Sequence, residues 1–254
     1  MGERTSGFKG RMLGGERLIG TFVKTPDVQV IEVLAMSGLD FLCLDAEHSP
    51  WGRDRIDPCL AVARALDLPC LVRVPDQLPG TALGMLDAGA VGLVVPHVDS
   101  AEKAAAIGRA AHFGKGGRGF AGSTRWAGYA TRGMGDVLAQ DSETLILAQI
   151  EEPEGVEHAA AIAGTEGIDA LFIGPSDLSV SYGHSSPDNP DLVPAFERVG
   201  AACRDAGIGF ATWVPGADGA AKWAPHGVNV YVVGSELTWM LNGAKAAVEA
   251  VRGA

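Results

Sequence analysis

The chain has 254 residues and a formal net charge of −11, with 20 Lys and Arg residues against 31 Asp and Glu residues. This acidic balance argues against nucleic acid or an anionic membrane as a partner, because both attract clustered Lys and Arg. The length fits one α/β barrel or two small domains, and no apolar run reaches the roughly 20 residues that a membrane-spanning helix needs.

Eight short apolar runs follow residues 1–17, which are polar and rich in glycine and predict a loose lead-in. The runs predict strands at Leu18–Val23, Phe41–Leu44, Cys70–Val74, Gly92–Val95, Leu145–Ile150, Ala170–Ile173, Gly209–Val214 and Val230–Val233. Helical patterns separate most of them, and the last helix is expected from Glu236 to about Val251. The segment 114–135 has no clear period, and long loops at a barrel rim are often functional.

This alternation of strands and helices is typical of a parallel sheet covered by helices. Eight such units favour an α/β fold of the closed (β/α)₈ TIM-barrel type, as a single domain over residues 1–254. An open, doubly wound sheet is the alternative, although no Gly-x-Gly-x-x-Gly motif follows the first strand. The polar N-terminus carries no signal peptide and the four cysteines lack CxxC spacing, so we expect a cytoplasmic protein with reduced thiols.

Two carboxylates stand at the ends of neighbouring predicted strands. Glu151 follows Leu145–Ile150, and Asp177 follows Ala170–Ile173 after a short Gly-Pro-Ser segment. The carboxyl ends of parallel barrel strands meet at one rim, where chemistry gathers. Two carboxylates there predict a site for a hard divalent cation such as Mg²⁺ or Mn²⁺. The alternative is that both residues merely begin or cap helices.

Polar side chains near the carboxyl ends of three strands are also in phase with one another. Because strand side chains alternate between faces, residues two apart lie on the same face. The sets that share a face are Cys43, Asp45 and Glu47; Leu71 and Arg73; and Leu147, Gln149 and Glu151. This phasing predicts that polar groups converge inside the mouth of the barrel.

Several segments together resemble the HpcH/HpaI aldolases over about residues 15–252. They are Leu44-Asp45-Ala46-Glu47-His48-Ser49-Pro50, Val72-Arg73-Val74-Pro75, Leu86-Asp87-Ala88-Gly89-Ala90, Gln149-Ile150-Glu151 and Phe172-Ile173-Gly174-Pro175-Ser176-Asp177-Leu178-Ser179. These aldolases are metal-dependent class II pyruvate aldolases, with 4-hydroxy-2-oxoheptanedioate aldolase as the best-known type. The resemblance implies a TIM barrel of the phosphoenolpyruvate/pyruvate superfamily type.

The resemblance also implies a role for each matching residue. Glu151 and Asp177 correspond to the metal ligands, and Gln149 to a residue that helps to set the metal and substrate. Arg73 corresponds to the arginine that contacts the pyruvate carbonyl oxygen, which suits an enolate oxygen chemically. A purely structural salt bridge from Arg73 to Glu47 or Asp45 is the alternative.

Two further residues match family residues that act in proton transfer and at a subunit interface. His48 corresponds to the family histidine that transfers a proton, a task that suits a pKa near neutrality. Asp87 corresponds to an aspartate that reaches the histidine of a neighbouring subunit, which implies trimers paired into hexamers. The alternatives are that His48 is a loop histidine without a role and that Asp87 is a surface acid at a helix end. The other histidines, His97 among them, match no motif and are expected to be structural or exposed.

The remaining site residues are expected around the substrate. Backbone N–H groups near Gly174, Pro175 and Ser176 can hold the pyruvate carboxylate at a helix start. Trp213 lies on the aldehyde side and would narrow the pocket. Asp45 and Glu47 are expected to orient both the metal's waters and the Arg73 side chain. Phe22 and Lys24 are expected to line the mouth. The arginines of the long loop, Arg118, Arg125 and Arg132, either meet an anionic aldehyde or lie on the surface.

We therefore expect a metal-dependent aldolase that reversibly cleaves a 4-hydroxy-2-oxo acid to pyruvate, or hydroxypyruvate, and an aldehyde. The cofactor would be Mg²⁺, Mn²⁺ or Co²⁺. The alternatives are a CoA-thioester lyase of the citrate lyase β-subunit or malyl-CoA lyase type, a barrel isomerase acting on a 2-oxo acid, and a non-catalytic binding protein. Schiff-base chemistry would need a desolvated lysine inside the barrel, and only Lys24 ends a strand.

Overall fold

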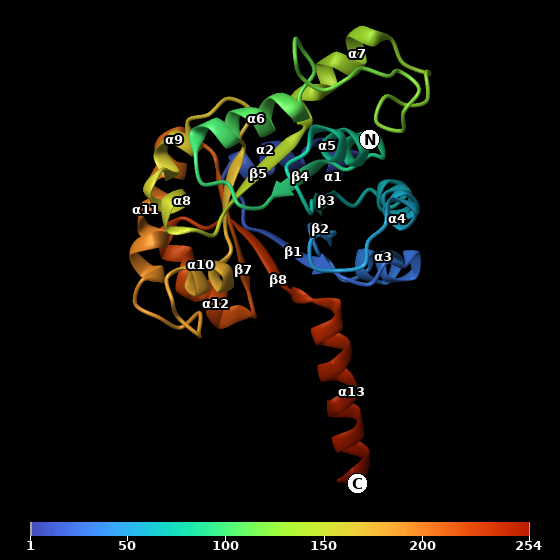
Figure 1. Ribbon diagram of the computed structural model, residues 1–254. Coiled ribbons are helices and arrows are strands. Elements are labelled where there is room, and N and C mark those ends of the chain that lie inside the picture. Colours follow the sequence, from blue (N-terminus) through green and yellow to red (C-terminus); the bar gives the residue numbers. More distant parts are fainter. Residues whose placement is uncertain (1, 254) are drawn as a thin grey trace.

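The computed structural model describes residues 2–253 and shows a closed barrel of eight parallel strands in sequential order (Figure 1). The strands are β1 (Leu18–Val23), β2 (Phe41–Asp45), β3 (Cys70–Arg73), β4 (Gly92–Val95), β5 (Leu145–Ile150), β6 (Ala170–Ile173), β7 (Gly209–Val214) and β8 (Val230–Ser235). Closure comes from the pairing of β1 with both β2 and β8. The TIM-barrel prediction is confirmed, and the open-sheet alternative is wrong.

Helices surround the strands and return the chain from each strand to the next. They are α1 (Glu3–Ser6), α2 (Phe8–Leu13), α3 (Val28–Ala35), α4 (Arg53–Ala65), α5 (Pro79–Asp87), α6 (Ala101–Ala111), α7 (Met134–Ala139), α8 (Pro153–Glu157), α9 (Ala159–Ala163), α10 (Pro175–Ser181), α11 (Leu192–Ala206), α12 (Ala217–Trp223) and α13 (Glu236–Arg252), with 3₁₀ turns η1 (Gln140–Glu143) and η2 (Ala224–His226). Within residues 2–253, no helix combines the length and apolar character that a bilayer crossing requires.

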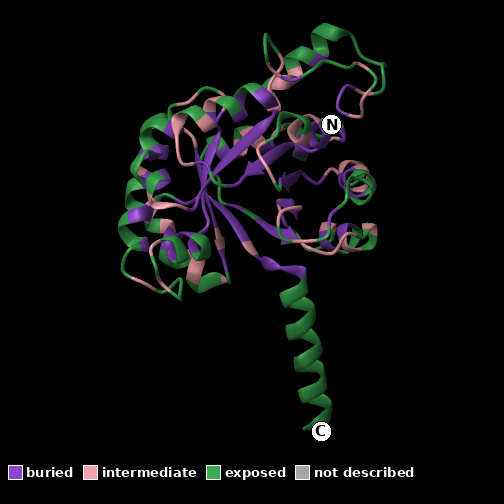
Figure 2. Ribbon diagram, viewed as in Figure 1, coloured by how far each residue is buried: buried purple, intermediate pink, exposed green. Residues whose placement is uncertain are grey.

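The strands bury both of their faces, which explains why they read as nearly continuous apolar runs (Figure 2). One face packs inside the barrel, with Cys43, Leu71 and Leu147 in a single interior cluster. The other face packs against the helices, as Leu44 and Val72 do. The in-phase pattern predicted for β2, β3 and β5 is therefore confirmed, and it directs their last polar side chains into the barrel mouth.

The N-terminal segment closes the opposite end of the barrel. Phe8 and Met12 of α2 are each 1% exposed and belong to the interior cluster. The Phe8 ring lies 5.4 Å from the Phe41 ring, centroid to centroid. A β-carbon on Gly209 would lie 3.0 Å from Met12, so this close approach favours glycine. The expectation of a loose lead-in is wrong for this segment, because α2 supplies part of the core.

The long segment 114–135 does not belong to the catalytic rim of its own barrel. It connects α6 to β5, and connections from helix to strand lie at the end of a barrel opposite to the active site. Its arginines make local contacts instead. Arg118 donates to Asp87 at 2.6 Å, and Arg125 donates to Asp57 at 2.7 Å. Arg132 donates to the backbone carbonyl of Asp136 at 2.9 Å. Within one chain none of the three meets the cavity: Arg132 is exposed, as the surface alternative supposed, Arg125 is partly buried, and Arg118 is buried at 4% exposure.

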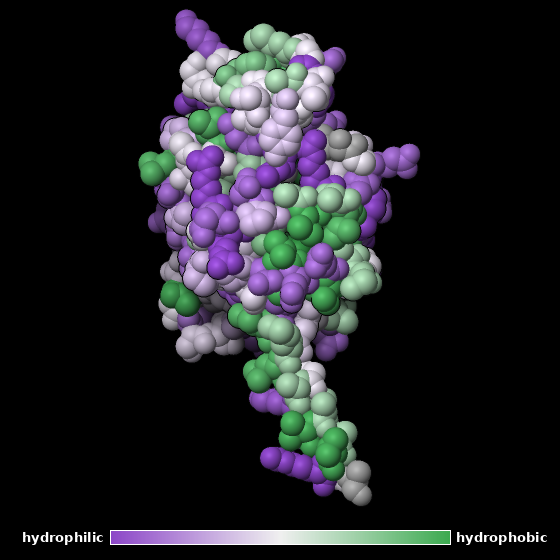
Figure 3. Space-filling view, turned by 90° about the vertical axis from the view of Figure 1, so that its right-hand side faces the viewer, coloured by the Kyte–Doolittle hydropathy of each residue, from purple (hydrophilic) through white to green (hydrophobic). Residues whose placement is uncertain are grey.

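The last helix, α13, does not lie along the barrel wall but projects away from it (Figure 1). Its side chains are exposed beyond Glu236, and several are large and apolar, including Met240, Leu241 and Val251 at 54%, 55% and 79% exposure. Figure 3 shows this apolar surface along the projecting helix. Exposed apolar area of this kind is typical of an interaction surface.

Candidate active site

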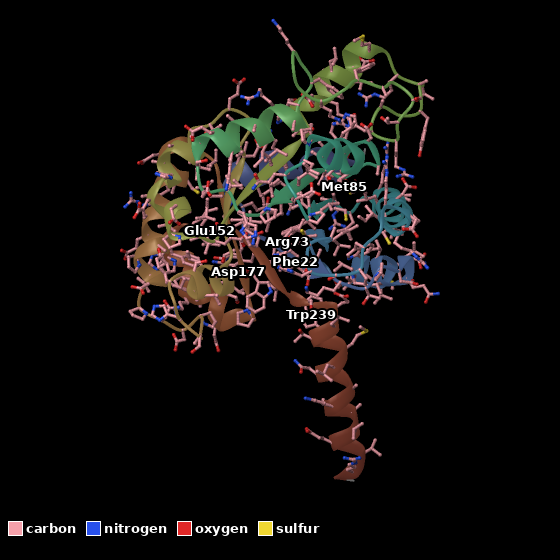
Figure 4. All side chains as sticks on the ribbon, viewed as in Figure 1. Phe22, Arg73, Met85, Glu152, Asp177 and Trp239 are labelled. Atoms are coloured by element: carbon pink, nitrogen blue, oxygen red, sulfur yellow. The ribbon has the colours of Figure 1, made fainter. Side chains whose placement is uncertain are left out.

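Side chains at the carboxyl ends of the strands enclose a cavity of about 320 Å³ in the barrel mouth. Figure 4 shows Phe22, Arg73 and Asp177 converging on this end of the barrel from different elements. The cavity is lined by Phe22, Lys24, His48, Arg73, Gln149, Phe172, Gly174, Pro175, Ser176, Asp177, Trp213, Gly234, Ser235 and Thr238. The sequence-predicted residues His48, Arg73, Gln149 and Asp177 thus meet around one space.

A buried charge network holds Arg73 at the floor of the cavity. Arg73 is 5% exposed and donates to Asp45 from Nε at 2.9 Å, and its Nη2 lies 2.8 Å from the same carboxylate oxygen. Its Nη1 lies 3.3 Å from Glu47, and its guanidinium stacks 4.3 Å from the centroid of the Phe22 ring. The structural salt bridges considered for Arg73 are therefore present. They orient the guanidinium and leave it lining the cavity.

Asp45 joins Arg73, the last residue of β3, to Lys24, which directly follows β1. It is fully buried, and its second oxygen accepts from Lys24 Nζ at 2.5 Å. Burial acts to raise the pKa of Asp45, but the charges of Arg73 and Lys24 outweigh it and hold that pKa below its usual value. Lys24 Nζ is thus held by a buried carboxylate.

Three of the sequence-predicted polar side chains surround Gly174. A β-carbon on this glycine would lie 3.0 Å from Gln149 Nε2, 3.2 Å from Glu151 Oε2 and 3.6 Å from Asp177 Oδ2. Gln149 Nε2 donates to Glu151 Oε2 at 2.5 Å. Glu151 does not cap the helix that follows, since the cap residue of α8 is Glu152. Asp177 does lie in the first turn of α10, as the alternative supposed, and still faces the cavity.

A histidine that the sequence did not single out stands beside this acidic group. His97 Nδ1 lies 3.1 Å from Glu151 Oε1 and 2.5 Å from Glu152 Oε1, while its backbone N–H donates to Glu151 at 2.9 Å. Its φ of 58° is left-handed, a strained conformation that clusters at functional sites. The expectation that His97 is exposed is confirmed, and the structure adds that it lies beside Glu151.

The signal that could have found His97 is its position directly after β4, next to the strand that ends in Glu151. Burial acts to lower the pKa of His97, but the hydrogen bond to Glu152 and the nearby carboxylate charges outweigh it and raise that pKa. His97 therefore adds a nitrogen ligand, or a protonated partner for the carboxylates, to the predicted metal ligands Glu151 and Asp177.

The donor set fits a divalent cation. Glu47, His97 and Glu151 each offer a ligand atom, and these atoms lie within 4.8 Å of one another. Buried Gln149 Oε1 and Glu47 Oε2 have no hydrogen-bond partner within the described residues. Burial raises the pKa of Glu151 to about 7; His97 opposes this shift, and the charges of Asp177 and Glu47 add to it. Glu47 Oε2 has the ion-pair contact with Arg73, whereas Gln149 Oε1 has no partner of either kind among those residues. A bound cation would compensate that oxygen and the repelling carboxylate charges.

The other predicted residues take different positions. His48 lines the cavity with a half-exposed side chain, 3.6 Å from Glu47. Trp213 also lines it, and its indole N–H donates to the carbonyl of Gly234 at 3.2 Å. Asp87 ends α5, at the end of the barrel away from the cavity, and pairs with Arg118. Its role toward His48 thus stays a prediction about a neighbouring subunit.

Comparisons with known proteins show the family of the chain. The family model described as HpcH/HpaI aldolase/citrate lyase matches residues 18–243. The chain is 31% identical over 256 residues to a hydroxypyruvate/pyruvate aldolase of Paraburkholderia phytofirmans, covering 98% of each. It is 33% identical over 233 residues to a 5-keto-4-deoxy-D-glucarate aldolase of Klebsiella pneumoniae, covering 91% of this chain and 90% of that one.

A solved structure gives the same result in three dimensions. The crystal structure of an HpcH/HpaI aldolase/citrate lyase family protein from Burkholderia cenocepacia aligns with a TM-score of 0.92 at 31% identity, covering 97% of this chain and 99% of that one. The similar proteins named above favour an aldolase over the CoA-thioester lyase and isomerase alternatives. The chain belongs to the HpcH/HpaI aldolase/citrate lyase family and is a metal-dependent aldolase, a lyase of carbon–carbon bonds.

Proposed function

We propose that this aldolase reversibly cleaves a 4-hydroxy-2-oxo acid to an aldehyde and pyruvate or hydroxypyruvate. The observation that carries the proposal is one cavity that joins a buried guanidinium, Arg73, to Asp177 and Gln149. Gln149 in turn contacts Glu151. Cleavage of the C3–C4 bond leaves negative charge on the C2 oxygen of the 2-oxo acid, which needs fixed positive donors. The hydroxypyruvate/pyruvate aldolase similar to this chain supports that substrate class.

The metal would be held by Glu151 and Asp177, with Gln149 beside them and His97 and Glu47 within reach. Carboxylate oxygens and an imidazole suit Mg²⁺, Mn²⁺ or Co²⁺. The cation supplies Lewis-acid stabilisation of the 2-oxo acid oxygens and a template that orients them. The buried Gln149 Oε1, which has no hydrogen-bond partner within the described residues, supports this assignment.

The chain's own residues would perform the remaining steps. Arg73 donates hydrogen bonds to the C2 oxygen as enolate charge develops there. His48 moves the proton of the C4 hydroxyl, directly or through water, since it lines the same cavity. At the start of α10, Gly174 and Pro175 shape the turn and the N–H groups of Ser176 and Asp177 hold the substrate carboxylate. Trp213 bounds the aldehyde side.

Asp45 and Glu47 would act through other groups. Both carboxylates contact Arg73, and Glu47 also lies beside His48. They therefore fix the direction of the guanidinium and balance its charge, so that it is already aimed when substrate enters. Glu47 would also orient water near the metal.

We further propose a homo-oligomer, a trimer or a hexamer, in the cytoplasm. The exposed apolar side chains of α13 support self-association, as do Val33 of α3 at 61% exposure and Met36, directly after α3, at 80%. Within one chain Asp87 lies away from the cavity, so its role would require His48 of a neighbouring subunit. The four cysteines are buried and unpaired, which suits a reducing compartment.

The test is pyruvate formation over a panel of 4-hydroxy-2-oxo acids with several metals. We expect EDTA to remove activity and Mn²⁺, Co²⁺ or Mg²⁺ to restore it. Borohydride with pyruvate should trap no covalent adduct, because Lys24 is paired with Asp45. Activity that survives thorough chelation, together with an adduct on Lys24, would overturn the proposed mechanism.

A further inference from the structure

One wall of the cavity carries polar side chains that neither the metal nor the enolate uses. Lys24 directly follows β1, Ser235 ends β8, and Thr238 lies in the first turn of α13; all three line the cavity. In a closed barrel of eight strands, β1 lies across from β5, the strand that Glu151 directly follows. This polar wall therefore faces the acidic group from the opposite side of the mouth.

The polar groups of this wall have donors and acceptors that are available to a ligand. Ser235 Oγ and Thr238 Oγ1 lie 3.4 Å apart, and within residues 2–253 each hydroxyl has only the other as a side-chain partner. The Lys24 ammonium has three donors and directs one of them to Asp45. Two hydroxyls that donate or accept, and an ammonium with free donors, thus border the same space.

A buried carboxylate holds the two halves of the wall together. Glu236, at 4% exposure, accepts from the backbone N–H of Lys24 at 2.9 Å and of Thr25 at 2.6 Å. It thereby ties the end of β1 to the start of α13, one residue after Ser235. Because charged hydrogen bonds to backbone N–H groups are strong, the spacing of the wall is fixed before a ligand arrives.

The charges of the wall are already balanced. Lys24 and Arg73 contribute two positive charges, and their partners Asp45 and Glu47 contribute two negative ones. No unmatched positive charge is left for a second carboxylate, whereas neutral hydroxyl groups can pair with Ser235, Thr238 and the free donors of Lys24. Beside them Trp213 offers an apolar flank, since its N–H is already bonded to Gly234.

We propose that Lys24, Ser235 and Thr238 form the aldehyde subsite and select an uncharged aldehyde that carries a hydroxyl beside its carbonyl carbon. This subsite rests on the proposed aldolase function. Glu236 is a positioning residue, because it holds the end of β1 against the start of α13. A site built to hydrogen-bond a hydroxyl discriminates against the analogue that lacks it, because its own polar groups are then left unpaired.

The test is aldol addition of pyruvate to glycolaldehyde, propionaldehyde and glyoxylate. Glycolaldehyde and propionaldehyde differ only by a hydroxyl in place of a methyl group, and glyoxylate carries a charge. We expect kcat/KM to favour glycolaldehyde over propionaldehyde by roughly tenfold, about the value of one good hydrogen bond. Ser235→Ala, Thr238→Val and Lys24→Met should each reduce that ratio several-fold, and Asn242→Ala, one turn further along α13, should not.

Exchange of the pyruvate C3 protons with solvent, measured without aldehyde, separates this subsite from the proposed function. If the wild type shows no exchange, the proposed function fails and the subsite falls with it. If the three variants still exchange protons but keep the wild-type aldehyde ratio, only the subsite is overturned. A wild-type preference for glyoxylate that disappears in Lys24→Met would likewise overturn the selection of an uncharged aldehyde.

Discussion

Replacing Arg73 with alanine is the sharpest test of how the cavity handles negative charge. The guanidinium is buried, bonded to Asp45 through Nε and Nη2, and stacked on Phe22. Truncation removes the positive donor that we assign to the enolate oxygen. It also leaves Asp45, which is fully buried, with Lys24 as its remaining cationic partner.

Two effects of different size follow from this geometry. Loss of one donor to a developing oxyanion costs on the order of 10²–10³ in kcat. Stability should fall less than for a fully orphaned buried charge, because Lys24 stays 2.5 Å from Asp45. We expect a loss of about 1–3 kcal/mol in the free energy of unfolding, the usual cost of a buried polar group that loses a partner.

The assay separates the two effects. Proton exchange at C3 of pyruvate reports enolate formation, cleavage of the 4-hydroxy-2-oxo acid reports turnover, and denaturant unfolding reports stability. Arg73→Lys should restore only part of the turnover, because an ammonium cannot copy the planar fork of the guanidinium. Arg125→Ala is the matched control, since Arg125 pairs with Asp57 away from the cavity.

One result would refute the reasoning outright. If Arg73→Ala exchanges pyruvate protons at the wild-type rate, then Arg73 does not stabilise the enolate, and its contacts with Asp45 and Glu47 are structural. A variant that loses exchange and also loses its fold would be resolved by Arg73→Lys, which keeps a positive charge beside Asp45.

Three other predictions test the metal, the barrel floor and the assembly. Glu151→Ala and Asp177→Ala should lose Mn²⁺ binding and turnover while keeping the fold, and undiminished calorimetric binding in both would remove them as ligands. Phe8→Ala should lower the free energy of unfolding by about 3–5 kcal/mol in denaturant titration, because Phe8 is buried in the barrel interior; a loose lead-in would give no change. His48→Ala and Asp87→Ala, each inactive, should regain activity when co-assembled, and an active monomer in light scattering would contradict this shared site.

The sequence by itself determined the strands and the direction of their side chains. Alternation along a strand is local, so the faces of Arg73, Gln149 and Glu151 could be read from residues two positions away. Parallel strands place their carboxyl ends at one rim, so these groups could be expected near one another. The structure shows that Arg73 and Gln149 indeed line one cavity, with Glu151 directly beside Gln149.

Only the tertiary structure decided which distant residues meet. His97 matches no motif, yet the register of β4 with β5 carries it to Glu151. Phe8 and Met12 stand in a segment whose glycines and charges predict a loose chain, and they are ordered by burial against the barrel interior. The Lys24–Asp45 pair likewise depends on the pairing of β1 with β2.

The physical reason is that periodicity reports which face a residue occupies, but not what lies opposite that face. Contact partners depend on strand register and barrel closure, which arise from packing across the whole chain. The same holds for α13, whose helical pattern was read correctly from the sequence. Its departure from the barrel wall, and the apolar side chains it leaves exposed, became visible only in three dimensions.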